Sequence, residues 1–517
     1  MVPDHPSPRL REALVESVAA SPEIPADPGT RRRIPGLVRF AGKATAVVGM
    51  RRAGKTTFVH QLRRERLVGG LSPENVPYIN FEDERLRGLD GSDLGFLEDE
   101  RARRFLNARE RGPVVWHFDE IQNVPGWETF VRRLLDSGGT EVVVTGSSAA
   151  LLSREVATSL RGRGWEVRIF PFSFEEALRH HGEPVPAEVP HLAGATRARL
   201  EGFFRNWLAA GGFPEAQGLD VENRVRLLRD YVDIAVLRDV IERHGVRNPT
   251  ALRWLVGQLL GSPAGLFSAE RFHRRMRAEG LAVSKDTVHE LLAHLADCFL
   301  IRLVWMESAS ARQRMVNPRK AYPVDSGLIA AWERVGRDNR GHALETAVHA
   351  ELERRGVEVT YVRTPAGREV DFLARSPDGT EELIQVSAEV FDPAVAEREI
   401  RGLVEAGAMF PRARRRLLTP TGEPLPLDPP PEVIVQPAYE WMLEDPARAA
   451  GGARRPPLTG RPRFSNRSVP RHVGHLGINS SSRAAPCRAL RQPSAGSAGL
   501  KAPTGRTGRR SRALPQP

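Results

Sequence analysis

Cysteine is almost absent from this chain of 517 residues, which contains only Cys298 and Cys487. The two lie far apart and neither belongs to a Cys-x-x-Cys pair, so a disulfide framework and a zinc site are disfavoured. Apolar runs near the ~20 residues of a membrane span are also absent. The first residues lack the apolar core of a secretory signal. We therefore expect a cytoplasmic protein with no membrane partner.

Acidic residues are missing from the last part of the chain, and this explains the overall net charge of +12. Residues 446–517 hold 15 Lys and Arg and no Asp or Glu, so the rest of the chain is slightly acidic. The net charge therefore gives no argument for a DNA-binding body. The same stretch has few large apolar residues, which predicts a disordered basic tail. It is either a solvated extension or an arm that binds nucleic acid.

The remaining sequence divides by its patterns into several expected domains. Residues 1–35 are expected to form an N-terminal arm and linker. Over residues 36–180, strand-like apolar runs alternate with helical segments, which predicts a parallel α/β sheet. Helical patterns follow over residues 181–247. Residues 248–330 are helical and then extended, and residues 331–445 return to a mixed α/β pattern.

The segment GMRRAGKT, from Gly49 to Thr56, fits the phosphate-loop pattern G-x-x-x-x-G-K-[ST] in full. It follows an apolar run and precedes a plausible helix, which is the context that such a loop requires. The glycines let backbone N–H groups face phosphates, Lys55 is expected to reach the β- and γ-phosphates, and the Thr56 hydroxyl is expected to bind Mg²⁺. The expected nucleotide-binding residues are Gly49, Arg52, Ala53, Gly54, Lys55, Thr56 and Thr57.

An acidic pair ends the apolar stretch PVVWHFDE. Asp119 is expected to hold Mg²⁺, and Glu120 to orient and polarise the attacking water. The alternative is a buried strand followed by an acidic helix cap. His117, inside the stretch, is interpreted as a structural histidine.

The next segment, EVVVTGSSAALLSREVATSLRGR, offers groups that respond to a γ-phosphate. Thr145 or Ser147, at the end of an expected strand, is placed to sense it. Arg154, Arg161 and Arg163 are candidates for neutralising transition-state charge, within one subunit or from a neighbour in a homo-oligomer. The alternative for each arginine is a surface ion pair.

These blocks, with YINFEDERL and FPFSFEEAL, resemble a prokaryotic AAA+-type ATP-binding family. The later GGFPEA, YPVDSGLI, ETAVHAELERRG, EVDFLAR and ELIQVS resemble its C-terminal partner, a domain of unknown function. The resemblance covers about residues 30–440. It implies ATP as the nucleotide and a P-loop NTPase sheet with an added strand between the two nucleotide motifs. It also implies a helical lid at 181–247, a winged helix at 248–330 and a restriction-endonuclease-like domain at 331–445.

The residues themselves leave the roles of the last two domains open. Residues 249–300 suit three helices of a helix-turn-helix variant, with arginines 271, 274, 275 and 277 on the second. Both DNA docking and a protein-docking or spacer role fit. In the end domain, Glu345 and Asp371 stand where a metal-dependent nuclease has acids. Gln385 and Ser387 replace its further acid and its lysine, so we expect a nuclease frame without activity.

We therefore expect a P-loop ATPase whose Mg²⁺-dependent hydrolysis moves the winged helix and the end domain. One alternative is a nucleotide-gated DNA-binding regulator with little turnover. Another is an ATP-dependent nuclease, against which Gln385 and Ser387 argue.

Overall fold

The structure is a computed structural model, and it describes residues 7–34, 37–40, 42–107, 112–147, 160, 162–189, 192–281, 283–310, 313, 317–333 and 339–444. The expected tail and two of the candidate arginines, Arg154 and Arg161, lie outside the described residues. Within the described ranges, no helix has both the length and the apolar character needed to cross a membrane.

The first sheet has five parallel strands in the order β2-β3-β4-β1-β5. The strands are β1 (Ala44–Val48), β2 (Tyr78–Asn80), β3 (Val114–Asp119), β4 (Thr140–Gly146) and β5 (Gly164–Arg168). Strand β4 pairs with both β1 and β3, so it lies between the strands that carry the two nucleotide motifs. Every residue of β3 is buried, as expected for a parallel sheet covered on both faces. The predicted P-loop NTPase sheet and its added strand are confirmed.

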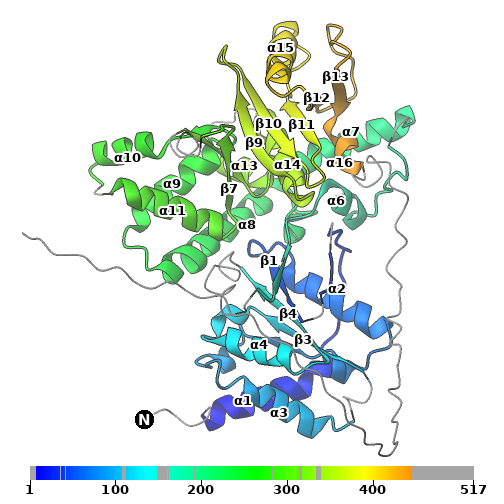
Figure 1. The fold of residues 1–517 in the computed structure, drawn as a ribbon, viewed down its shortest axis with the longest axis vertical. Helices are drawn as coiled ribbons and strands as arrows, with labels where there is room; N and C mark the ends of the chain where they lie inside the picture. The colour runs from blue at the N-terminus through cyan, green and yellow to red at the C-terminus, as the bar shows by residue number, and fades with distance from the viewer. Residues whose placement is uncertain are drawn as a thin grey trace, which may run out of the picture. The chain divides into compact units, whose positions relative to one another are not determined.

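Helices cover this sheet (Figure 1). They are α1 (Pro8–Ala20), α2 (Lys55–Val68), α3 (Gly95–Arg104) and α4 (Trp127–Asp136), with short 3₁₀-helices η1 (Ser21–Glu23), η2 (Pro73–Asn75), η3 (Glu84–Leu86) and η5 (Ile121–Asn123). Helix α6 (Phe174–His180) follows β5 and buries Phe174 in a second core cluster. Helix α1 packs against α3 and buries Leu14 completely in the main core. The segment expected to be an arm and linker therefore contributes to the core of the sheet domain.

A helical segment follows, made of α7 (Gly194–Ala210), η7 (Pro214–Ala216), α8 (Val221–Ile234) and η8 (Ala235–Glu242). The last of these is a π-helix that continues α8. The next segment contains three helices and three strands. In chain order they are α9 (Pro249–Gly261), β6 (Leu266–Phe267), α10 (Ala269–Ala278), α11 (Lys285–Asp297), β7 (Ile301–Met306) and β8 (Arg319–Pro323). Both β6 and β7 are antiparallel to β8.

The end of the described chain forms α13 (Gly327–Trp332), α14 (Arg340–Arg354), β9 (Glu358–Arg363), β10 (Glu369–Arg375), β11 (Glu381–Val386), α15 (Pro393–Met409), β12 (Arg414–Thr419), β13 (Val433–Pro437) and α16 (Ala438–Leu443). Strand β9 pairs in parallel with β7, at Trp305–Thr360 and Met306–Tyr361. The second sheet therefore runs on without interruption from β13 to β6, across the expected domain boundary at residue 330.

Candidate nucleotide-binding site

The loop between β1 and α2 has the backbone that its glycines predict. Gly49 has a φ of +153°, and a Cβ there would lie 2.2 Å from the carbonyl oxygen of Ile169. Gly54 has a φ of +96° and is the N-cap of α2. The loop therefore passes the chain after β5 at a distance that only glycine permits, and it delivers free N–H groups at the start of a helix.

Asp119 ends β3 and is the centre of a set of hydroxyl groups. Thr56 Oγ1 donates to its Oδ2 oxygen over 2.8 Å, and Tyr78 Oη donates to the same oxygen over 2.7 Å. Thr145 Oγ1 donates to the other oxygen. Asp119 as a whole is 2% exposed. The residues expected to bind Mg²⁺, Thr56 and Asp119, are thus in direct contact.

Glu120 lies next to the loop lysine in a strained backbone position. Its φ is +52°, which is rare for a residue with a side chain and concentrates at functional sites. Its Oε1 lies 3.6 Å from Lys55 Nζ, and its N–H donates to Thr145 Oγ1 over 2.9 Å. Burial raises the pKa of Glu120, but Lys55 and a hydrogen bond from Gln122 outweigh it and lower the pKa. The carboxylate is therefore held ionised, as a group that orients water must be.

Two acids from the helical segment hold the loop arginines. Arg51 Nε donates to Asp239 Oδ2 over 2.8 Å, and Asp239 lies on the π-helix η8. The other oxygen of Asp239 accepts from Ser147 Oγ over 2.7 Å. Arg52, which has a φ of +65°, pairs with Glu215 at 3.2 Å. From the sequence, Arg52 is expected only as a nucleotide-binding residue, and these contacts are not anticipated.

Sequence comparison agrees with this geometry. A family model described as "AAA domain" matches residues 41–178, and a "Domain of unknown function (DUF8612)" model matches residues 202–339. The chain is 32% identical to "Uncharacterized protein MJ1544" of Methanocaldococcus jannaschii over 369 residues, which cover 70% of this chain and 78% of that protein. The chain belongs to this AAA-domain family of P-loop proteins.

A second relative, an uncharacterized protein of Haemophilus influenzae, is 30% identical over 64% of this chain and 79% of its own. Among solved structures, the Aeropyrum pernix ORC2 protein (ADPNP-ADP complexes) matches at 12% identity over 68% of this chain and 95% of that chain, with a TM-score of 0.32. The Aeropyrum pernix ORC1 protein in complex with DNA matches at 17% identity over 64% and 94%, with a TM-score of 0.25. TM-scores this low say nothing about function.

Within the AAA domain, Thr145 and Arg163 lie in different surroundings. Thr145 is buried between Asp119 and the N–H of Glu120, so it positions both acids. Arg163 precedes β5 and pairs with Asp136. Its carbonyl accepts from the N–H of Ala44, the first residue of β1. The loop lies at the opposite end of that strand, about 16 Å away for five extended residues. The structure therefore does not bring Arg163 to the loop of its own chain.

Tyr78 is a site residue that sequence reasoning missed, because nothing in the short run YIN marks it. It stands on β2, which pairs with β3 at His117, Phe118 and Asp119. Burial, and then the charge of Asp119, raise the pKa of the Tyr78 hydroxyl, so it remains a donor to that carboxylate. His117 is fully buried: burial lowers its pKa to about 3 and its Nδ1 contacts the carbonyl of Pro77 at 3.1 Å, whereas its buried Nε2 has no hydrogen-bond partner among the described residues.

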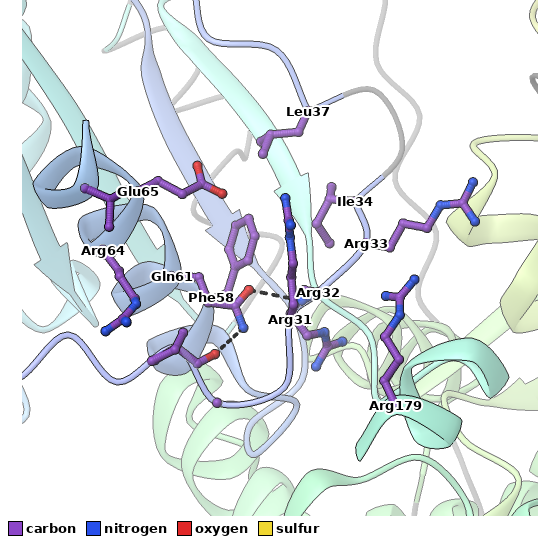
Figure 2. A pocket seen from close by; sticks show the side chains of 13 residues that line it. Arg31, Arg32, Arg33, Ile34, Leu37, Phe58, Gln61, Arg64, Glu65 and Arg179 are labelled. Carbon is purple, nitrogen blue, oxygen red and sulfur yellow. Dashed lines mark hydrogen bonds between the residues drawn. The ribbon is translucent and has the colours of Figure 1, made fainter. Parts of the chain in front are cut away.

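A basic pocket of about 880 Å³ lies beside α2 (Figure 2). Gln61 fixes the chain that frames it, since its Oε1 accepts from the N–H of Arg32 over 3.1 Å and its Nε2 donates to the carbonyl of Thr30 over 2.7 Å. Arg32 then reaches the nucleotide loop, where its guanidinium donates to the carbonyl of Ala53 over 3.0 Å. The segment before β1 therefore supports the nucleotide loop through the hydrogen bond from Arg32 to Ala53. Four further arginines line the pocket: Arg31, Arg33, Arg64 and Arg179.

Proposed function

We propose that this protein binds ATP with Mg²⁺ on the loop Gly49–Thr57, hydrolyses it, and transmits the change to its helical segment. The observation that carries the proposal is the 2.8 Å contact between Thr56 Oγ1 and Asp119 Oδ2. Hydroxyl and carboxylate oxygens are the hard ligands that Mg²⁺ takes. Adjacent ligands of an octahedral ion, with bonds of about 2.1 Å, lie about 3.0 Å apart, so this donor pair would fit the ion. Mg²⁺ supplies charge neutralisation on the phosphates when it is bound.

Lys55 and Glu120 share the chemistry in this proposal. Lys55 Nζ donates to the carbonyl of Met50 over 3.3 Å, beside Glu120. Phosphate oxygens offer it a stronger acceptor, and its departure leaves the Glu120 carboxylate free to accept a proton from water. The strained backbone of Glu120 fixes the direction of that carboxylate. Gln122 contacts the same carboxylate and holds it in place.

The switch is proposed to act through the two loop arginines. Arg51 is bound to Asp239 and Arg52 to Glu215, so two neighbouring loop residues are attached to the helical segment. A phosphate chain on the loop competes with both acids for these guanidinium groups. Asp239 also accepts from Ser147, which follows β4, so η8 is held to both the sheet and the loop, and loss of the Arg51 pair would weaken its hold on the loop. Differential binding of this kind is what lets a ligand shift a conformational equilibrium.

The deciding experiment is ATP hydrolysis by the purified protein with Mg²⁺, beside Lys55→Ala and Glu120→Gln. We expect Lys55→Ala to lose nucleotide binding. Glu120→Gln should bind ATP and lose turnover by about 10²–10⁴-fold, the usual contribution of a general base. Asp378→Asn, in an exposed turn, is the matched control and should be unchanged. If the wild-type protein binds ATP but does not hydrolyse it, the proposal of hydrolysis is overturned, and the alternative of a nucleotide-gated regulator stands.

A second candidate, DNA binding, is supported by the order α9-β6-α10-α11-β7-β8, which is that of a winged helix. Helix α10 carries the basic residues Arg271, Arg274, Arg275 and Arg277, and Arg275 lies over the half-exposed ring of Trp254 at 5.8 Å. Fluorescence anisotropy of duplex DNA, with Arg271→Ala/Arg274→Ala beside wild type, tests it. Binding that weakens with salt and is lost in the variant supports DNA as a partner. Unchanged binding argues against this helix.

A further inference from the structure

One buried lysine connects the start of β8 with the acids of the end domain. Lys320 Nζ lies 2.9 Å from Glu345 Oε1 on α14, 2.9 Å from Glu369 Oε1 on β10 and 2.9 Å from Asp371 Oδ1, also on β10. Its side chain is 4% exposed. Lys320 donates hydrogen bonds to Glu345 and Asp371 and forms an ion pair with Glu369.

Two of the acids around Lys320, Glu345 and Asp371, make further hydrogen bonds within the chain. Glu345 Oε1 also accepts from Tyr322 Oη over 2.7 Å. Asp371 Oδ2 accepts from the N–H of Val386 over 3.0 Å, and the side-chain oxygen of Gln385 accepts from the N–H of Asp371 over 3.2 Å. The side-chain oxygen of Gln385 is therefore occupied by a backbone N–H group. Both oxygens of Asp371 are likewise occupied by groups of the chain itself.

Lys320 does not come from the position at which the nuclease pattern has its lysine. Ser387 occupies that position, directly after β11. Lys320 comes instead from β8, where it pairs with Val304 of β7 and Leu266 of β6. On the same strand, the ring of Tyr322 stacks on His349 of α14 with a centroid distance of 4.5 Å and an interplanar angle of 5°. Two side chains of β8 are thus inserted against the end domain.

We infer that Lys320 is the resident cation of this acidic centre: its ammonium takes the place of a divalent metal and fastens the three-helix, three-strand segment to the end domain. The side chains of Glu345 and Asp371 are only 13% and 9% exposed, so leaving these two carboxylates without a cation would be strongly destabilising, whereas Glu369 is 33% exposed. The described residues include no group of three or more His, Cys, Asp or Glu side chains arranged to hold a metal ion. The end domain then serves as a structural partner of β8, and the ammonium group of Lys320 occupies the place where a nuclease of this pattern would bind its metal ion.

The titration of the cluster agrees with this assignment. Burial alone would lower the pKa of Lys320, but Asp371, Tyr322 and Glu345 raise it well above its ordinary value, so the ammonium stays charged. Burial, and then the charge of Asp371, raise the pKa of Glu345 to about 7, against the opposing effect of Lys320. Two further groups face the cluster, His342 on α14 and Glu399 on α15. Burial lowers the pKa of His342 and raises the pKa of Glu399, and the charges of Lys320 and Asp371 act on both pKa values.

The first test is a thermal double-mutant cycle on the full chain with Lys320→Met, Asp371→Asn and the double variant. Lys320→Met should melt well below wild type, because three acids lose their cation. Asp371→Asn should rescue part of that loss, so the double variant should melt above Lys320→Met. A double variant that only adds the two losses would overturn the inference. If Lys320→Met fails to fold, a folded double variant still supports it, and a double variant that also fails to fold overturns it.

The second test asks whether the centre takes a metal. The probe is Mn²⁺ without nucleotide, on an Asp119→Asn background that removes the candidate site at the loop. In that background Mn²⁺ should leave the melting temperature unchanged, and it should raise the melting temperature of Lys320→Met. Lys285→Met, which removes a surface lysine paired with Glu270 at 2.8 Å, is the matched control and should show no effect. A Mn²⁺ effect in the background protein that Asp371→Asn abolishes would overturn the inference, as would a folded Lys320→Met that ignores Mn²⁺.

Discussion

Thr56 and Asp119 lie on different elements, at the start of α2 and the end of β3, and their side chains are joined by a hydrogen bond of 2.8 Å. Strand β4 separates β1 from β3, so this contact spans the width of a strand. Tyr78 and Thr145 hold the carboxylate from two further strands. The two oxygens are therefore placed before any nucleotide arrives, and little reorganisation is needed when a metal ion enters.

We expect Asp119→Asn to abolish the dependence of nucleotide binding on Mg²⁺. The amide keeps the shape of the side chain and an acceptor for Thr56, but it lacks the charge that attracts the ion. ATP hydrolysis should fall by about 10²-fold or more, while ATP binding without Mg²⁺ should survive. Titration of ATP with and without Mg²⁺ measures both effects. Full Mg²⁺-dependent turnover in the variant would remove Asp119 from the metal site.

Some residues of this site could be predicted from the sequence because they belong to local patterns, and others could not. Lys55, Thr56, Asp119 and Glu120 belong to local patterns, and the carboxyl ends of parallel strands meet at one edge. Tyr78 reaches that edge only through strand pairing. Arg163 fails to reach it because the direction of β5 places it at the other edge.

The contacts of Asp239 and Lys320 could not be predicted from sequence patterns for a different reason. Asp239 and Lys320 meet their partners through packing between segments far apart in the chain: Arg51 and Asp239 are 188 positions apart, and Lys320 and Asp371 are 51. Spacing along the chain carries no signal for such pairs. The second sheet likewise crosses an expected boundary, because the pairing of β7 with β9 depends on tertiary structure.

Gly49→Ala should disable the loop. The added Cβ would lie 2.2 Å from the carbonyl oxygen of Ile169, which is backbone and cannot swing aside. We expect a loss of about 1–3 kcal/mol in the free energy of unfolding, as for other overpacked sites, together with loss of ATP binding. Gly194→Ala, at the start of α7 with open space around it, should stay within about 1 kcal/mol of wild type. Denaturant unfolding and nucleotide titration of both variants measure the contrast, and equal behaviour of the two would contradict this geometry.

Leu14→Ala should show that the first helix belongs to the core. Leu14 is 0% exposed in the main cluster, so its truncation leaves a cavity and should cost about 2–5 kcal/mol. Leu106→Ala is the matched control, because Leu106 is 80% exposed and should change stability by less than about 0.5 kcal/mol. Equilibrium unfolding gives both values. A negligible cost at Leu14 would return residues 1–35 to the role of a loose arm.

Asp325 joins two motifs that the sequence analysis could only place in order. Its Oδ2 accepts from the N–H of Gly212 over 2.7 Å, and its Oδ1 accepts from the N–H of Gly327 over 3.0 Å. The turn after α7 is thereby fixed to the start of α13. Two N–H donors favour the ionised carboxylate, but complete burial outweighs them and raises the pKa of Asp325 to about 6, from an ordinary value of 3.8.

A raised pKa makes the protonated form of Asp325 the one that folding favours. Its contribution to stability is therefore complete below about pH 4 and is lost as the pH rises through 6, by at most about 3 kcal/mol for a difference of this size. Asp325→Asn cannot titrate, so the free energy of unfolding of wild type minus that of the variant should fall between pH 4.5 and 7. Urea unfolding of both proteins across this range measures the difference, and the other groups cancel. A difference that stays constant with pH would show that the carboxylate is ionised throughout and that its two N–H donors outweigh its burial.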